Sequence, residues 1–140
     1  MVVNILKKWE KEHFRKVLGE IKQKGIDFSL DNLEEIIECA SYDIRSSEQG
    51  GECSYYPSGE KCHDLDDLNC FLCACPNYES ESWEGGCEVN SGDGRWKYHE
   101  KLPAGRVWDC TDCQVNHSPE EVRHYIKENF NELKKIFDSL

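Results

Sequence analysis

The sequence predicts a small α+β protein. An irregular core of cysteine and histidine residues with short strands is flanked by an N-terminal helical hairpin and a C-terminal helix. Apolar residues recur at three- and four-residue steps near both ends of the 140-residue chain, as in amphipathic helices. Eight of the nine cysteines lie in residues 47–117, which contain only seven Ile, Leu and Val residues. Burial of these few aliphatic side chains cannot offset the conformational entropy that the segment loses on folding. The segment therefore needs another source of stability.

Residues 1–46 are expected to form two helices that pack against the rest of the chain. Gly25 has the position of a C-terminal cap and is expected to end the first helix. The second helix is expected to begin at Asp31, which has capping-box spacing with Glu34, and to run to about Tyr42. The side chains expected on the buried faces are Leu6, Trp9, Phe14, Val17, Leu18 and Ile21 in the first helix and Leu33, Ile36 and Ile37 in the second.

Residues 118–140 are expected to form one C-terminal helix packed on the core. Ser118 is the expected N-cap, Pro119 stands at the first helical position, and Glu121 completes a capping box. Five apolar residues then form a stripe that is expected to pack against the N-terminal helices: Val122, Ile126, Phe130, Leu133 and Phe137.

The middle segment, residues 47–117, is expected to contain loops and two short strands. The strands are expected at Arg95–Tyr98 and Arg106–Trp108, with a turn at Pro103–Gly105 between them. The segment holds fourteen acidic and five basic residues, which give −9 of the formal net charge of −11. We expect no nucleic-acid partner, because binding a phosphate backbone needs clustered Lys and Arg.

Membrane insertion and export are both unexpected from the sequence. No apolar run is long enough to span a bilayer. Charged residues interrupt the N-terminal sequence, where a signal peptide needs an uninterrupted apolar core. We therefore expect a cytoplasmic protein without a membrane partner, in which nine cysteines favour metal ligation over disulfides.

The cysteine and histidine spacing of the middle segment is typical of metal ligands. The two C-x2-C steps, Cys70–Cys73 and Cys110–Cys113, each allow a tight turn to direct two thiolates at one tetrahedral ion. Four residues after Cys113, His117 adds a donor just before the expected C-terminal helix. The candidate ligands are Cys53, Cys62, His63, Cys70, Cys73, Cys75, Cys87, Cys110, Cys113 and His117.

Ten candidates exceed the four ligands of one structural zinc, so two zinc ions are predicted. Neighbours such as Cys62 and His63 would point to opposite sides of an extended chain, which also favours more than one site. His13, His99 and His124 are interpreted as packing or surface residues. The preferred division gives one ion Cys70, Cys73, Cys110 and Cys113, and the other a choice among Cys53, Cys62, His63, Cys75, Cys87 and His117.

An iron–sulfur cluster is the alternative cofactor. Cys70, Cys73 and the Cys75–Pro76 pair partly match the ferredoxin run, although their spacing differs from it. Such clusters are mostly bound by thiolates alone, so a role for His63 and His117 would favour zinc.

A longer pattern resembles a known family. It consists of Cys62–His63, the C-x2-C-x-C-P string from Cys70 to Pro76, and the late C-x2-C-x3-H string from Cys110 to His117. This pattern is similar to that of the cysteine-rich small domain family, found largely in anaerobic archaea and bacteria. The resemblance covers about Cys53 to Tyr125 and implies a zinc-finger-like, metal-binding domain with an accessory role. One departure is Asn116, where family members often have proline.

Two function hypotheses remain open. The first is a small protein-interaction or accessory module with structural zinc, serving a protein partner. The second is an iron–sulfur or thiolate-metal protein in the redox, sulfur or cofactor metabolism of an anaerobe. No nucleophile–base set, phosphate loop or recognised carboxylate pair is present. A catalytic zinc keeps one position open for water, whereas ten candidate ligands favour closed sites, so an enzyme is not expected.

Overall fold

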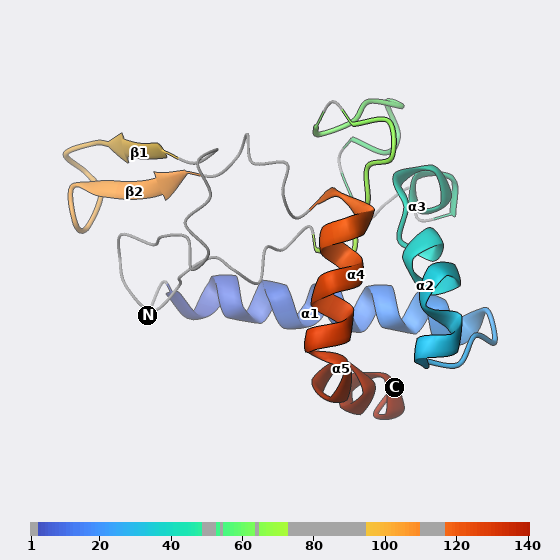
Figure 1. Cartoon of the computed structure of the whole chain (residues 1–140). Coiled ribbons are helices and arrows are strands. Elements are labelled where there is room, and N and C mark those ends of the chain that lie inside the picture. The colour runs from blue at the N-terminus through green and yellow to red at the C-terminus, as the bar shows by residue number, and fades with distance from the viewer. Residues whose placement is uncertain (1–2, 49–52, 54, 64, 73–94, 110–116) are drawn as a thin grey trace.

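The computed structural model describes residues 3–48, 53, 55–63, 65–72, 95–109 and 117–140. This part of the chain forms five helices, a 3-10 turn and one two-stranded antiparallel sheet, and so confirms the predicted α+β class (Figure 1). None of the described helices is both long and apolar enough to cross a bilayer. The elements in order are α1 (Val3–Gln23), η1 (Leu30–Asn32), α2 (Leu33–Cys39), α3 (Tyr42–Glu48), β1 (Arg95–Tyr98), β2 (Arg106–Asp109), α4 (Pro119–Glu128) and α5 (Phe130–Asp138).

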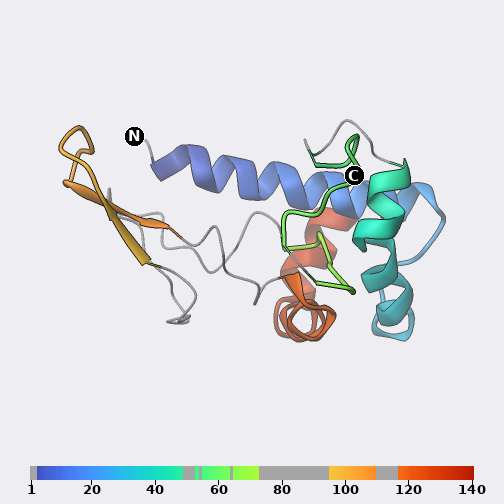
Figure 2. The ribbon, with the colours of Figure 1, turned by 90° about the horizontal axis from the view of Figure 1, so that it is seen from above.

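Helix α1 is the longest element, and the other helices pack around its C-terminal half (Figures 1 and 2). Its buried face carries Phe14, Val17, Leu18 and Ile21, as predicted. The prediction for Trp9 is wrong, because its side chain is 51% exposed. At 3.6 residues per turn, a five-residue step turns through about 140°, which places Trp9 on the opposite side from Phe14. The side chain of Leu6 lies outside the described part of the chain.

Gly25 caps α1 as predicted. Its φ of 76° is a left-handed conformation that glycine adopts without strain. Its N–H donates to Lys22 O at 3.0 Å, which satisfies one of the last carbonyls of the helix.

The second helix differs from the prediction at both ends. Asp31 lies in η1, and α2 begins only at Leu33, with no side-chain cap. The Glu34 carboxylate is held by Arg123 at 2.7 and 2.9 Å, so it does not reach back to form the capping box. The helix ends at Cys39 instead of Tyr42, because the following residues pair with the segment before Cys70. The expected buried residues Leu33, Ile36 and Ile37 are confirmed.

The predicted C-terminal helix is two helices. Ser118 caps α4 as predicted, since its side chain accepts from the Glu121 N–H at 3.2 Å. The break lies at Asn129, whose φ of −115° and ψ of 23° leave the helical region. Its side-chain amide donates to Tyr125 O at 3.0 Å, the carbonyl that also accepts from the Asn129 N–H at 2.9 Å.

The predicted strands and their turn are confirmed. Trp96 pairs with Trp108 across the hairpin, with ring centroids 5.2 Å apart in an edge arrangement. The Arg106 guanidinium lies 3.7 Å from the centroid of Trp96. Gly105, with φ 78°, closes the connecting turn.

One large apolar cluster joins the helices. Phe28 stacks on Phe130 and Phe137, with centroids 5.1 and 5.6 Å away. Phe71 and Leu72 also belong to this cluster, although they lie between Cys70 and Cys73 in the sequence. The turn of the first C-x2-C step therefore inserts two apolar side chains into the helical core. The buried members are Phe14, Val17, Leu18, Ile21, Phe28, Leu33, Ile36, Ile37, Ala40, Phe71, Leu72, Val122, Ile126, Leu133 and Phe137.

Candidate metal centre

A second, smaller buried cluster lies next to α3. Its buried members are Tyr42, Tyr56, Leu68 and Cys70. The two tyrosine rings meet edge to face at 5.8 Å, and the Tyr42 hydroxyl donates to Glu60 O at 2.8 Å. Three cysteines, Cys53, Cys62 and Cys70, thus gather in one small group, because the first two pack against the cluster and the third belongs to it.

The segment from Leu68 to Cys70 is held against the link between α2 and α3. The Tyr42 N–H donates to Leu68 O at 2.9 Å, and the Cys70 N–H donates to Ala40 O at 2.7 Å. Asn69 is 1% exposed, and its side chain donates to Ile37 O at 2.8 Å and accepts from the Phe71 N–H at 3.0 Å. Every one of these bonds fixes the backbone on either side of Asn69.

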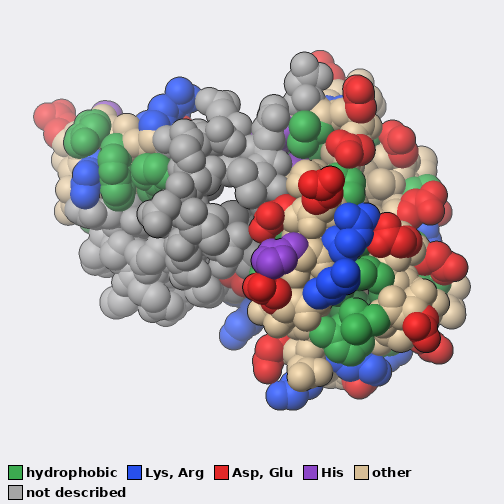
Figure 3. Space-filling view, in the orientation of Figure 1, with side chains coloured by type: hydrophobic (Ala, Val, Ile, Leu, Met, Phe, Trp, Pro, Cys, Tyr) green, Lys and Arg blue, Asp and Glu red, His purple; other side chains and the backbone are tan. Residues whose placement is uncertain are grey.

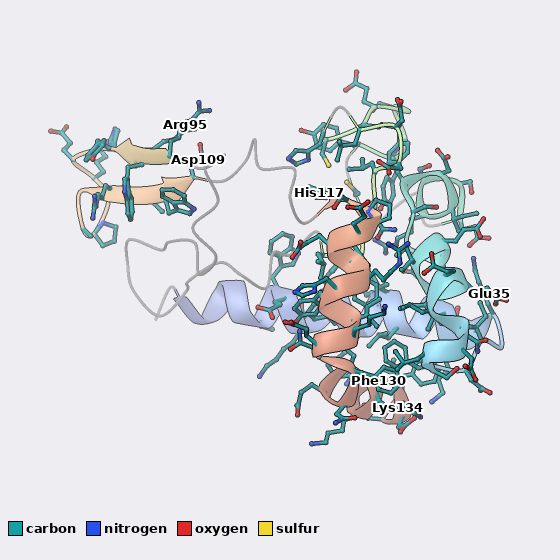
Figure 4. All side chains as sticks on the ribbon, in the orientation of Figure 1. Glu35, Arg95, Asp109, His117, Phe130 and Lys134 are labelled. Atoms are coloured by element: carbon teal, nitrogen blue, oxygen red, sulfur yellow. The ribbon has the colours of Figure 1, made fainter. Side chains whose placement is uncertain are left out.

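His117 lies at the N-terminal end of α4 (Figure 4). Both its backbone and its ring are hydrogen-bonded to this segment. The Asn69 N–H donates to His117 O at 2.8 Å, and the His117 Nδ1 lies 3.3 Å from Asn69 O. Because a carbonyl oxygen only accepts, Nδ1 carries the proton and donates. The second nitrogen, Nε2, then keeps its lone pair, which is the form of histidine that binds metals.

Burial keeps His117 neutral. The His117 side chain is buried, and this burial lowers the pKa of His117 to about 4. A charge on His63 lowers the pKa further. At neutral pH the ring therefore carries one proton and presents one nitrogen lone pair.

Three candidate ligands come together at this point: Cys62, His63 and His117. Their donor atoms all lie within 4.8 Å of one another. The His63 Nδ1 lies 3.1 Å from Cys62 Sγ, and the two imidazole rings lie 4.1 Å apart. In a tetrahedral zinc site with the usual bond lengths, sulfur and nitrogen ligands are about 3.5 Å apart. A thiolate with two imidazoles is a donor set that fits zinc.

The surroundings of Cys62 favour its neutral thiol. Burial raises the pKa of the Cys62 thiol, and charges on Cys70 and Cys53 raise it further. Without a metal ion, burial therefore favours the protonated thiol at Cys62. A bound dication reverses this preference, because coordination to a metal deprotonates a thiol.

The structure brings together only part of the predicted ligand set. Cys62 and His63 contact each other because the chain bends there, so the argument from an extended chain does not apply. Cys53 and Cys70 lie in the adjoining cluster, which places Cys70 beside Cys62 although the preferred division separates them. The remaining candidates lie outside the described residues, and the division between two ions stays a prediction: Cys73, Cys75, Cys87, Cys110 and Cys113.

Sequence reasoning missed the polar residues that support the site. Asn69 has no recognisable motif, because its role depends on contacts with α2 and His117, which are far away in the sequence. Arg45 is 3% exposed and donates to both carboxylate oxygens of Glu20 at 2.8 and 2.7 Å. It also donates to the Tyr56 hydroxyl at 3.3 Å, so the pair connects α1 with the cysteine-bearing loop.

Comparison with known proteins gives one family match. The family model described as a cysteine-rich small domain, zf-like, matches residues 45–139, which are 95 of the 140 residues. No curated protein and no solved structure matches the chain. The matched segment contains Cys62, His63 and His117, whereas α1 and α2 precede it.

Proposed function

The chain belongs to the cysteine-rich small domain family, and on that basis we propose that it binds zinc as a structural, non-enzymatic module that serves a protein partner. The observation that carries the metal-binding proposal is the cluster of Cys62, His63 and His117. His117 is buried and neutral, its Nδ1 is occupied by a backbone carbonyl, and its second nitrogen belongs to a group with a thiol and another imidazole. This is the donor chemistry of a zinc site with an oriented ligand.

A fourth protein ligand would make the site structural. Cys70 belongs to the small buried cluster beside α3, and both Cys53 and Cys62 pack against that cluster. If the Cys53 or the Cys70 thiolate binds, four protein atoms close the coordination sphere and leave no position for a reactive water. This closed site is why we favour a structural role over hydrolysis.

We propose a second zinc ion from the other thiols. Five further predicted ligands are present in the sequence, which is more than one tetrahedral ion needs: Cys73, Cys75, Cys87, Cys110 and Cys113.

The surface charge suggests the chemistry of the protein partner. The chain has a formal net charge of −11, and acidic side chains spread over the helical part of the molecule in Figure 3. The side chains of Glu34, Glu35 and Glu38 in helix α2 are all exposed to solvent. We therefore propose a partner with a basic surface, in the cytoplasm, because like charges repel and opposite charges steer association.

Metal analysis of protein purified without oxygen tests the cofactor. We expect a colourless protein with about two zinc ions per chain, since zinc has a filled d shell. A brown protein with iron and acid-labile sulfide would instead establish the iron–sulfur alternative.

Single substitutions test the ligand assignment. Cys62→Ser, His63→Ala and His117→Ala should each lower zinc affinity by about 100-fold, because roughly 10–16 kcal/mol of binding free energy is shared among four ligands. The matched control is His124→Ala, whose exposed side chain pairs with Glu128 at 3.3 Å on the outer side of α4. Chelator competition measures the affinity. Equal affinities in His117→Ala and His124→Ala would remove His117 from the site.

A further inference from the structure

His13 connects α1 to the turn of the first C-x2-C step. Its Nε2 lies 2.8 Å from Cys70 O and 3.0 Å from Phe71 O. Both partners are carbonyl oxygens, so Nε2 carries the proton and donates to the two of them. The contact spans 57 residues of sequence, and His13 lies well before the segment that the family model matches.

The two carbonyls belong to the backbone that orients His117. Asn69 O accepts from His117 Nδ1, and the Asn69 N–H donates to His117 O. The Asn69 side chain also accepts from the Phe71 N–H, so residues 69–71 form one bonded unit. A rotation of the Cys70 or Phe71 peptide groups would therefore change the direction of the Cys70 side chain and of the carbonyl that holds His117.

A second polar contact from the same face of α1 supports the first. Glu20 lies seven residues, or about two helical turns, after His13. It binds Arg45, which in turn donates to the Tyr56 hydroxyl beside Cys53 and Cys70. Helix α1 thus holds the cysteine-bearing loops at two positions.

We propose that His13 is a positioning residue of the metal centre, which acts by holding the carbonyls of Cys70 and Phe71 so that residues 69–71 present His117 and Cys70 to the ion. This inference rests on the proposed metal-binding function. It adds to that function a residue of α1 whose Nε2, within the described part of the chain, contacts backbone carbonyls and not a metal-ligating side chain.

The test uses the full chain with Zn²⁺ and with Co²⁺ as a spectroscopic probe. We expect His13→Ala to lower zinc affinity by about tenfold, which is the lower end of the range for groups that orient metal ligands. The Co²⁺ absorption bands, which report ligand geometry, should shift in the same variant. His13→Gln should restore both measurements, because its amide N–H extends as far along the side chain as the histidine Nε2 and donates to carbonyl groups.

Val17→Ala distinguishes positioning from general loss of stability. Val17 is 1% exposed on the same helix and belongs to the apolar cluster, so its truncation destabilises α1 packing. We expect this variant to lower the unfolding midpoint but to keep the wild-type Co²⁺ spectrum and zinc affinity.

Each outcome has a defined meaning. Wild-type affinity and spectrum in His13→Ala overturn the proposal, and so does an equal loss in Val17→Ala or a failure of His13→Gln to restore them. Failure of the proposed function has a different signature. In that case the wild-type chain binds neither metal, or its binding does not change in Cys62→Ser.

Discussion

The helical body and the cysteine-bearing loops are stabilised by different interactions. Among the described residues, fifteen buried side chains form the core of the helical body, whereas the cluster beside α3 contains four, one of them Cys70. The loops compensate with hydrogen bonds to buried backbone groups, mainly through Asn69 and His13. The helices therefore depend chiefly on apolar burial, whereas the loops depend on polar contacts and, in our proposal, on metal.

Removal of metal gives the largest expected difference between the two regions. A strong chelator should abolish amide protection in residues 53–72 but leave protection in α1, α4 and α5, because apolar contacts hold those helices. The loops would lose the binding free energy of a structural zinc, which is on the order of 10 kcal/mol. Hydrogen exchange with and without chelator measures the change in amide protection. Unchanged protection in the loops would show that polar contacts alone suffice there.

Phe71→Ala should damage both regions at once. Phe71 is fully buried in the helical core, 5.7 Å from the ring of Phe14, and it directly follows Cys70. We expect a loss of about 3–5 kcal/mol in the free energy of unfolding, the usual effect of truncating a buried phenylalanine. Urea unfolding measures stability, and chelator competition measures zinc affinity, which should also decrease.

Leu133→Ala is the matched control for Phe71→Ala. Leu133 is 2% exposed in α5, within the helical core. Its truncation should cost about 2–5 kcal/mol of stability and leave zinc affinity unchanged. A comparable decrease in zinc affinity for both variants would mean that the two regions are not separable in this way.

The pH dependence of stability should report the histidine that connects the regions. Burial, together with the positive charge of Arg45, lowers the pKa of His13 to about 4. Between its unfolded value near 6.5 and this value, the unfolded chain binds more protons, so stability falls as the pH decreases. The full shift corresponds to roughly 3 kcal/mol. His13→Gln should lose less stability between pH 7 and pH 5, as measured by urea midpoints. Parallel pH profiles for the two proteins would contradict this assignment.

Ser118→Ala should have the smallest effect. Ser118 caps α4 directly after His117, so the substitution removes a helix cap without changing a candidate ligand. We expect a loss of about 1 kcal/mol in unfolding free energy and no change in zinc affinity. Ser118→Asp, which retains a capping oxygen, should recover the stability. A clear decrease in affinity in Ser118→Ala would show that the cap also positions His117.

The parts of the fold that depend on local sequence were predicted well. The cap at Ser118, the strands around Pro103–Gly105 and the burial of Val17 and Leu18 follow from neighbouring residues alone. The end of α2 at Cys39 and the role of Asn69 depend on pairing between segments that are far apart in the sequence. No periodicity or local spacing signals such pairing.

The same limit applies to the candidate site. The spacing after Cys113 drew attention to His117, because a histidine before a capped helix is a local signal. His13 has no such signal, since its partners are backbone carbonyls, and any residue type offers those. The sequence around Phe71 also gives no sign of its role, because its burial depends on helices that are far away in the sequence.

The distribution of the apolar cluster determines how this protein can be divided. Nine of its fifteen buried members come from residues 14–40, and six from residues 71–137. The segment that the family model matches, residues 45–139, therefore supplies less than half of the core that the described residues form. If the chain were cut at residue 45, the matched segment would expose Phe71, Leu72 and the inner faces of α4 and α5 to water. The unit that can be transplanted into another protein is thus larger than the unit that the family pattern recognises, and it includes α1 and α2.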